Sequence, residues 1–404
     1  MKKLRHPLAW AVLAVCASTA AQAQISDGVV KIGVLTDMAG PYSGMGGAGS
    51  VVAAKMAVED CLQNECKGMK IEVVSADHQN KADIAASRAR EWLDRDKVDA
   101  MVDLTNSAGA LAVQKLIKEK GGIAMYSGPA TTRLTNEDCA ENGFHWMFDT
   151  YSSASGAAAA LTRGGDKTWY FLTVDYAFGH SLEKDASEMV KANGGTVAGA
   201  VRHPLNASDF SSFLMQAQNS KAHIIGMANA TQDAINTIKA AREFGITEKG
   251  QKLAALMLQV TDVHAMGLRV AQGLVSSEGY YWDMDDQTRD FAARFEKVQK
   301  VKPNQVHAGV YSSVLHYLKA VAAAKSDNAD AVSAKMRELP IKDAVMRNAS
   351  IRPDGRVIHD MYLVEVKTPA QSKGAWDYYN ILSTIPANQA FMPLAQSQCP
   401  LVKK

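Results

Sequence analysis

The sequence predicts an α/β protein made of two doubly wound units, each with a parallel sheet covered by helices on both faces. Short apolar runs rich in β-branched residues alternate with helical stretches of about 10–15 residues. The same rhythm restarts after Tyr151. A chain of 404 residues is also longer than one ordinary hydrophobic core requires, so two units are expected.

The first unit opens with an apolar strand that a glycine-rich turn connects to a helix. Strands are expected at residues 29–35, 70–75, 100–104 and 123–126, and helices at 50–62, 82–93 and 108–119. Gly121 and Gly122 end the last of these helices, as glycine commonly does. Strands that are separated by helices in this order form a parallel sheet.

The second unit repeats the pattern at similar size. Strands are expected at 168–174, 197–203, 223–227 and 252–258, and helices at 154–161, 181–192, 210–217 and 232–244. Two further helices, at 291–299 and 310–324, and a late strand at 361–367 follow. The chain therefore leaves the second unit and returns toward the first, with Tyr280, Tyr281 and Trp282 at the return.

Residues 1–23 have the pattern of a cleavable secretory signal. Three basic residues precede an apolar stretch at 8–17, which is too short to span a bilayer. Ala21-Gln22-Ala23 then fits the small-x-small rule of signal peptidase. We expect cleavage before Gln24 and a mature protein that acts outside the cytoplasm. Lipidation of Cys16 is the alternative, although Val15 stands where Gly or Ala is usual.

Charge after cleavage is nearly balanced. Residues 1–23 hold three of the 44 Lys and Arg residues and none of the 42 Asp and Glu residues, so the mature net charge is −1. This balance predicts no broad basic face and argues against nucleic acid as a partner. No later stretch reaches the ~20 apolar residues of a membrane-spanning helix.

Four cysteines remain after cleavage, which in an exported chain indicates disulfides. Cys61 and Cys66 are close enough in sequence to close a small loop at a helix end. Cys139 and Cys399 would then pair and fix the C-terminal tail to the body of the protein. Metal binding is the rival interpretation, but the spacing lacks CxxC or His-x3-His.

Ligands of open α/β sheets bind beyond the carboxyl ends of the strands, so the loops after each strand are the candidate site. In the first unit these loops are 40–46, 105–108 and 127–132, and in the second they are 175–179, 229–231 and 259–262. They are rich in hydroxyls, amides and backbone N–H groups near helix starts, which suits a small anion such as a carboxylate. Thr105, Asn106 and Ser107 are equally suited to capping a helix.

Three patterns suggest other functions and are weaker. Residues 44–49 match G-x-G-x-x-G, but the preceding turn is long and no acid ends the second strand, so these glycines are better explained by close backbone approach. Asp283, Asp285 and Asp286 lack EF-hand spacing and suit a solvated loop and helix cap. The sequence has no G-x-S-x-G or HExxH motif. We therefore expect no catalytic residues, no cofactor and no metal site.

The whole pattern resembles the periplasmic solute-binding proteins of ABC importers, in the branched-chain amino acid (leucine/isoleucine/valine-binding) family. The resemblance rests on VKIGVLTD at 30–37 with GPYS at 40–43, on IEVVSADHQNK at 71–81, and on DYAFG at 175–179. It covers essentially the whole mature chain. No single motif is highly specific, but their order and spacing are.

The resemblance implies a type I periplasmic binding protein, with two lobes joined by three crossovers. Lobe 1 would comprise residues 24–145 and 276–358, lobe 2 residues 146–275 and 359–385, and a tail 386–404 would be pinned by a disulfide. A ligand would be captured by closure of the cleft between the lobes. The implied partner is a permease in the inner membrane, the implied location is the periplasm, and the expected state is a monomer.

The family's ligand residues map onto the loops identified above. Asn106, Ser107, Pro129 and Thr131, with neighbouring Thr105, would hold a ligand carboxylate, and Tyr42 or Met45 would cover the ligand. From the second lobe, Tyr151, Phe178, Asn229 and Gln259 would close over it, and Trp282 and Tyr311 would line the wall near the hinges.

One departure bears on the ligand. Amino-acid binders of this family pair the ligand's α-ammonium with a second-lobe acid, because a buried cation needs a partner. Here Gln259 aligns nearest that acid, and Asp262 is better placed to cap a helix. The stretches HWMFDTY at 145–151 and YYWD at 280–283 are similar to a subgroup that binds aromatic or other amine-free carboxylates. We therefore expect an aromatic or short-chain carboxylic acid.

Other classes stay open at this point. The amino-acid binding function of the wider family is one, and a ligand-sensing protein that signals to a membrane receptor is another. A secreted enzyme is the third, and the missing nucleophile–base pair argues against it.

Overall fold

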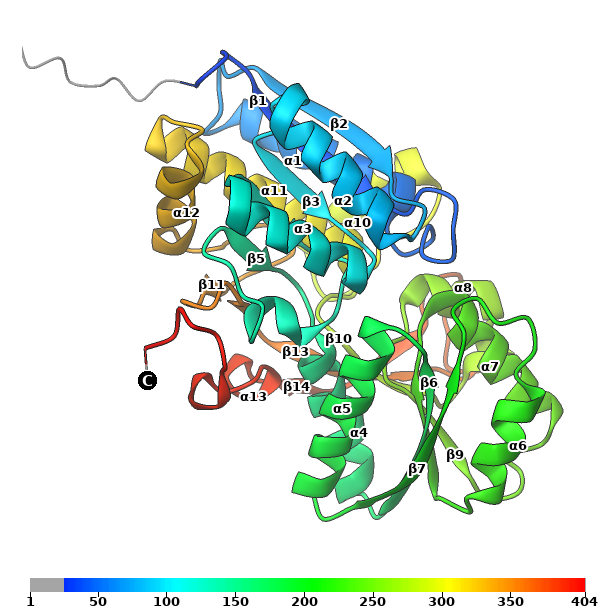
Figure 1. The fold of residues 1–404 in the computed structure, drawn as a ribbon. Coiled ribbons are helices and arrows are strands. Elements are labelled where there is room, and N and C mark those ends of the chain that lie inside the picture. The colour runs from blue at the N-terminus through cyan, green and yellow to red at the C-terminus, as the bar shows by residue number, and fades with distance from the viewer. Residues whose placement is uncertain (1–24, 404) are drawn as a thin grey trace, which may run out of the picture.

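The computed structural model describes residues 25–403 and has two α/β lobes connected by several chain crossings (Figure 1). The expected signal peptide and Cys16 lie outside the described residues. Within 25–403, every helix is too short or too polar to cross a membrane. The α/β class and the two-lobed type I architecture expected from the sequence are confirmed.

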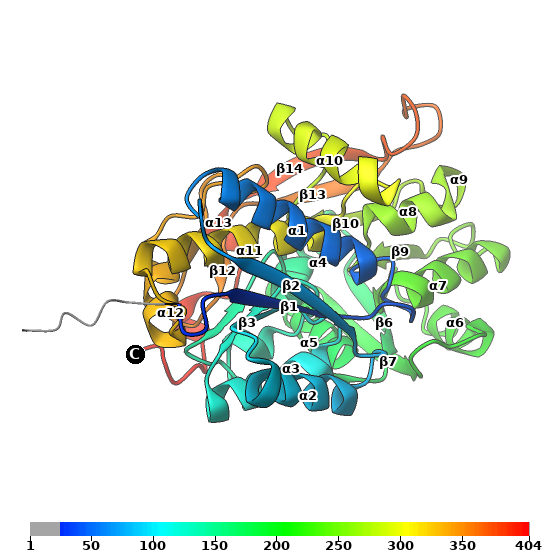
Figure 2. The same cartoon turned by 90° about the horizontal axis from the view of Figure 1, so that it is seen from above.

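The first lobe contains a five-stranded parallel sheet with strand order β2-β1-β3-β4-β5. Its strands are β1 (Val30–Thr36), β2 (Ile71–Asp77), β3 (Ala100–Asp103), β4 (Ile123–Tyr126) and β5 (Gly143–His145). Its helices are α1 (Gly47–Gln63), α2 (Ala82–Glu91), α3 (Ser107–Lys120), α10 (Asp286–Gln299), α11 (Gln305–Ala324) and α12 (Ala329–Glu338), with short helical turns η1 (Trp92–Asp96) and η2 (Thr132–Thr135). Strands β3 and β4 are wholly buried, because helices cover both faces of the sheet. Figure 2 shows α1 and α11 on one face and α2 and α3 on the other.

The second lobe repeats this design with a four-stranded parallel sheet, order β7-β6-β8-β9. Its strands are β6 (Thr168–Val174), β7 (Thr196–His203), β8 (Ile224–Ala228) and β9 (Lys252–Ala255). Its helices are α4 (Thr150–Arg163), α5 (Ala177–Ala192), α6 (Ser211–Asn219), α7 (Thr231–Glu243), α8 (Val260–Met266) and α9 (Leu268–Ala271). The two sheets present their carboxyl ends to each other across the cleft, which positions their loops for a shared site.

A third sheet lies where the chain passes between the lobes. It is antiparallel, with order β10-β13-β14, and comprises β10 (Val275–Glu278), β13 (Met361–Val366) and β14 (Tyr379–Ile385). The remaining elements are the two-stranded β11 (Ser350–Ile351) and β12 (Val357–Ile358), helix α13 (Ala387–Ala390) and turn η3 (Leu394–Gln396). The chain crosses between the lobes after β5, after β10 and after β12.

The glycine-rich turn before α1 serves close packing. A Cβ on Gly49 would lie 2.3 Å from Nε2 of His307 on α11, and a Cβ on Gly46 would lie 2.6 Å from Cγ2 of Thr105. Any larger side chain would push α1 away from α11 or from the end of β3. This supports the close-approach interpretation of the 44–49 glycines over a dinucleotide motif.

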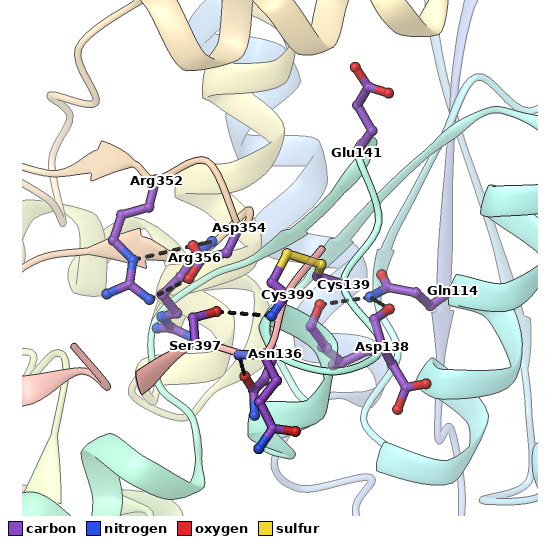
Figure 3. The surroundings of a disulfide bond; sticks show 12 residues. Gln114, Asn136, Asp138, Cys139, Glu141, Arg352, Asp354, Arg356, Ser397 and Cys399 are labelled. Atoms are coloured by element: carbon purple, nitrogen blue, oxygen red, sulfur yellow. Dashed lines mark hydrogen bonds and ion pairs between the residues drawn. A yellow bond between two sulfur atoms is a disulfide. The ribbon is translucent and has the colours of Figure 1, made fainter. Parts of the chain in front are cut away.

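Both predicted disulfides are confirmed. Cys61 pairs with Cys66, and Cys139 pairs with Cys399 over a sequence separation of 260 (Figure 3). Next to the second bridge, the backbone N–H of Gln398 donates to Oδ1 of Asn136 at 2.6 Å. The C-terminal tail is therefore held to the first lobe by a covalent bond and by hydrogen bonding.

Replacing both Cys139 and Cys399 with serine is expected to lower the free energy of unfolding by about 2–5 kcal/mol. Cross-linking residues 260 apart removes much of the conformational freedom of the unfolded chain. Urea unfolding of the oxidised protein measures the effect. The matched control is the Cys61→Ser/Cys66→Ser variant, whose loop spans only 5 residues and should lose less. Equal losses in the two variants would contradict the loop-length argument.

Candidate functional site

A small cavity lies between the two lobes. Loops after β1, β3 and β4 supply its first-lobe wall, and loops after β6, β8 and β9 supply its second-lobe wall. Its lining residues are Tyr42, Met45, Thr105, Ser107, Gly128, Ala130, Phe148, Tyr176, Phe178, Ala230 and Met257. This lining is mostly apolar and aromatic with four hydroxyls, and it contains no ionised side chain, which is typical of a small-molecule binding site.

The loop after β1 is shaped by a buried carboxylate. Asp37 accepts hydrogen bonds from the backbone N–H groups of Gly40 (2.8 Å) and Tyr42 (2.9 Å), which folds the loop and turns Tyr42 toward the cavity. The hydroxyl of Thr105 accepts from the N–H of Asp37 at 3.2 Å and lies 3.1 Å from Nε2 of His78. Burial lowers the pKa of His78, so its ring is neutral at neutral pH.

The turn from β3 to α3 has an uncommon backbone. Asp103 and Leu104 have φ values of 79° and 62°, which non-glycine residues seldom adopt. This turn brings Thr105 and Ser107 to the cavity, and Oγ of Ser107 accepts from the N–H groups of Ala130 (3.3 Å) and Thr131 (3.4 Å). Strain of this kind often occurs at functional sites.

Gly128 and Asp103 pack tightly under the cavity. A Cβ on Gly128 would lie 2.5 Å from Oδ1 of Asp103, so only glycine fits at this position. The Asp103 side chain is fully buried, and this burial raises its pKa to about 6. Side-chain size is therefore restricted at the floor of the cavity.

Two long helices begin at the cavity, one from each lobe. Helix α3 starts at Ser107, and α5 starts directly after Tyr176, and neither has an acidic residue in its first turn. No side chain caps the N-terminus of α5. The uncapped N–H groups of α5 and the positive end of each helix dipole favour a negatively charged ligand group here.

The lobes meet through polar contacts around the cavity. The hydroxyls of Thr131 and Ser181 are 2.7 Å apart, and Thr231 donates to the carbonyl of Pro41 at 2.9 Å. Asp185 on α5 accepts from the hydroxyls of Thr132 (3.1 Å) and Thr150 (2.5 Å). The structure thus describes the lobes in contact, with the cavity between them.

A buried arginine ties two of the crossovers together. Arg356 is fully buried and donates to the carbonyls of Phe148 (3.0 Å), Trp146 (3.0 Å) and Val357 (3.1 Å), and it pairs with Asp149 at 3.5 Å. Burial lowers its pKa to about 10, so it stays charged at neutral pH. Because Phe148 lines the cavity, Arg356 links these crossovers to the site. Nothing in the sequence pattern singled it out.

Five predicted site residues line the cavity: Tyr42, Met45, Thr105, Ser107 and Phe178. Five others lie next to it: Asn106, Pro129, Thr131, Asn229 and Gln259. Their hydrogen bonds are made to protein groups, but the buried Oδ1 of Asn229 and Oε1 of Gln259 have no partner among residues 25–403. Asn106 caps α3 through Gly109 N–H (2.8 Å), and the carbonyl of Pro129 accepts from the His145 ring (2.8 Å). The Asn229 amide donates to the Thr237 hydroxyl (3.1 Å). Thr131 contacts the second lobe, as given above, and Gln259 is the N-cap of α8.

Three predicted residues lie away from the cavity. Tyr151 is in the first turn of α4, and this register directs it to a groove with Arg163 and Ile385. The Trp282 indole donates to the carbonyl of Trp376 at 2.8 Å, and the Tyr311 hydroxyl donates to Asp60 at 2.7 Å. Tyr151 thus lines a separate groove, and the polar groups of Trp282 and Tyr311 are hydrogen-bonded within the protein.

Six lining residues were not among the predicted site residues: Gly128, Ala130, Phe148, Tyr176, Ala230 and Met257. Four of them belong to the predicted loops, next to predicted site residues. Phe148 lies in the stretch 145–151 that indicated an aromatic-acid subgroup, and Met257 lies in the predicted strand 252–258. No group of three or more His, Cys, Asp or Glu side chains within residues 25–403 could hold a metal ion.

This fold and cavity define a two-lobed solute-binding protein. The family model described as "Periplasmic binding protein" matches residues 29–375, and the chain belongs to that family. A curated relative, the Leu/Ile/Val-binding protein homolog 6 of Brucella suis biovar 1 (strain 1330), is 26% identical and covers 86% of this chain and 90% of its own length.

Solved structures agree with this assignment. A periplasmic binding protein from Burkholderia mallei is 50% identical with a TM-score of 0.91, covering 93% of this chain and 100% of that chain. A branched chain amino acid ABC transporter periplasmic ligand-binding protein from Burkholderia xenovorans LB400 is 40% identical with a TM-score of 0.81, at the same coverage. The protein is thus a periplasmic substrate-binding protein of ABC transport and not an enzyme.

A more distant structure shares the fold alone. It is a solute-binding protein of an ABC transporter from Rhodopseudomonas palustris BisB5 in complex with 3,4-dihydroxy benzoic acid. It is 22% identical with a TM-score of 0.78, covering 89% of this chain and 98% of that chain.

Proposed function

We propose that this protein captures a small carboxylate that lacks an amine, an aromatic or short-chain organic acid, and delivers it to an ABC permease in the inner membrane. The observation that carries the proposal is the cavity lining, which offers hydroxyls and helix N-termini but no acidic side chain. Such a site favours an anion and leaves an ammonium group without a charged partner.

The second-lobe acid expected of an amino-acid binder is missing from the lining. Gln259 is buried, and the carboxylate of Asp262 accepts from the Gln259 N–H at 2.9 Å, so this acid is engaged at the start of α8. Burying an unpaired ammonium costs several kcal/mol. Aromatic side chains in the lining, including Phe148 and Phe178, suit a ring or an alkyl chain. The ligand of the distant Rhodopseudomonas palustris protein belongs to the same chemical class.

Capture would occur by lobe closure. We take residues 24–145 with 276–358 as one moving lobe and residues 146–275 with 359–385 as the other, with rotation at the three crossovers. The cavity is lined from both lobes, so a ligand would bind the closed state more tightly than the open one. That difference in affinity is what drives closure.

Pairs of ligands that differ only in the α-ammonium test the proposal most directly. 3-Phenylpropanoate and 4-methylpentanoate match phenylalanine and leucine without the amine. Calorimetric titration of the mature protein, stripped of bound ligand by unfolding and refolding, should show at least 100-fold tighter binding of one or both acids, or of benzoate. Tighter binding of the amino acid in each pair would overturn the proposal.

Branched-chain amino-acid binding is the second candidate, and the name of the 40% identical Burkholderia xenovorans protein favours it. Leucine would then bind more tightly than 4-methylpentanoate.

Ligand affinity is expected to fall by on the order of tenfold between pH 6 and pH 8. Asp185 is buried against Thr132 of the opposite lobe, and this burial raises its pKa to about 7, with Asp149 and Glu188 adding to the rise. Closure therefore takes up a proton, so the closed state is favoured below this pKa and loses stability as the pH rises through it. Titrations at several pH values measure the slope.

An Asp185→Asn variant isolates this effect, because Asp233 and Asp262 near the cleft also have raised pKa values. Asparagine keeps the shape and the acceptor oxygen but does not titrate. The variant should show a flatter profile, and a slope equal to that of the wild type would assign the pH dependence to another group.

A further inference from the structure

Two tyrosine hydroxyls, one from each lobe, meet inside the cavity. The oxygens of Tyr42 and Tyr176 are 2.6 Å apart, although the residues are separated by 134 positions in the sequence. Both side chains line the cavity. Tyr42 follows β1 of the first lobe, and Tyr176 precedes α5 of the second, so the contact exists only while the lobes are closed.

The pair has one O–H proton more than it uses. Each phenol carries one proton, and the hydrogen bond between them requires only one. Among residues 25–403, neither hydroxyl has another hydrogen-bond partner. One O–H group thus remains without an acceptor in a largely buried position, and buried donors are nearly always satisfied.

The pair keeps both protons at physiological pH. Burial raises the pKa of Tyr42 and of Tyr176, and the nearby carboxylates of Asp37 and Asp233 raise both values further. These carboxylates are not hydrogen-bonded to either hydroxyl; Asp37 is engaged by the backbone N–H groups of its own loop. The free O–H therefore acts as a donor.

We propose that the Tyr42–Tyr176 pair donates its free O–H to an oxygen acceptor of the bound ligand and so is a specificity determinant of the cavity. This inference rests on the proposed function, since the acceptor is an oxygen of the captured acid, either in the carboxylate or in a ring substituent. The pair forms between lobes, so a ligand that accepts this proton also stabilises the closed state.

A double variant provides the decisive test. In Tyr42→Phe or Tyr176→Phe alone, the remaining hydroxyl is still able to donate, so each single variant should lose little affinity. Tyr42→Phe/Tyr176→Phe removes both donors and should weaken binding roughly 10- to 100-fold, as expected for a hydrogen bond to a charged group. Tyr170→Phe, on β6 outside the cavity, is the matched control for loss of a hydroxyl.

The ligands used are benzoate and 4-hydroxybenzoate, titrated calorimetrically into each variant. Loss with both acids identifies the carboxylate as the acceptor, and loss with 4-hydroxybenzoate alone identifies the ring oxygen. Affinity within twofold of the wild type for both acids in the double variant would overturn the inference, provided that its thermal midpoint without ligand matches that of the control.

Failure of the proposed function gives a different result. In that case the wild type binds leucine and neither acid, and the same variants are then titrated with leucine, whose carboxylate is the remaining oxygen acceptor. A matching loss supports the tyrosine pair even so, and unchanged leucine affinity overturns it.

Discussion

Replacing Ala130 with phenylalanine is expected to abolish ligand binding, with a loss of at least 100-fold in affinity, while the protein still folds. Ala130 lines the cavity and is only 3% exposed, so a benzyl group there would occupy the space of the ligand. The cavity is small, and neighbouring Gly128 is packed against Asp103, so the floor has little room to yield. Calorimetric titration with the acids named above measures the loss.

The control for this variant is Ala192→Phe, at the exposed end of α5 and outside the cavity. This variant adds the same benzyl group to the protein without filling the site. Its affinity should equal that of the wild type. Retained binding in Ala130→Phe, with a normal circular dichroism spectrum, would mean that ligand binds elsewhere.

Replacing Arg356 with methionine is expected to lower the free energy of unfolding by about 3–5 kcal/mol. The side chain is fully buried, and its loss would leave Asp149 and the carbonyls of Trp146 and Phe148 without their partner. Methionine retains comparable apolar bulk, so the loss reports on the polar contacts. Urea unfolding followed by tryptophan fluorescence measures it.

Arg356→Lys separates charge from geometry. Lysine keeps the positive charge, but its single ammonium does not reproduce the planar set of donors that serves three carbonyls. This variant should recover only part of the lost stability. A change below about 1 kcal/mol in Arg356→Met would contradict the view that this arginine holds the crossovers together.

The fold was predictable from local pattern because both units repeat strands with strong apolar runs. The strands at 123–126 and 168–174 match β4 and β6 residue for residue. Helix starts were less accurate: α10 and α11 begin at Asp286 and Gln305, five residues before their predicted starts, because polar first turns follow the caps Asp285 and Asn304. The cap expected among Asp283, Asp285 and Asp286 is thus confirmed at Asp285.

Strands that depend on distant partners were missed. β10 reads Val-Ser-Ser-Glu, and its buried Glu278 gives no apolar signal. It is a strand because β13 pairs with it from more than 80 positions further along the chain. Two other elements were also missed. The strand β5 has only three residues, and the helix α12 is short and polar on its outer side. Local periodicity does not contain this tertiary information.

The candidate site was predictable only to the level of its loops. Loops after parallel strands meet at one sheet edge, which is why Tyr42, Thr105, Ser107 and Phe178 line one cavity. Which residue of a loop faces the cavity depends on the helix register that follows. Tyr151 shows this, because α4 begins at Thr150 and turns the ring away. Met257 and Phe148 required the relative position of the lobes, which sequence spacing does not specify.

The bridge between Cys139 and Cys399 closes a covalent ring that contains the whole second lobe and all three crossovers. A single break in the backbone anywhere inside that ring opens it without releasing a fragment, because the two ends stay joined through the bridge. A periplasmic protease therefore has to cut the ring twice before a fragment separates. With one cut, a reductant has to break the disulfide as well.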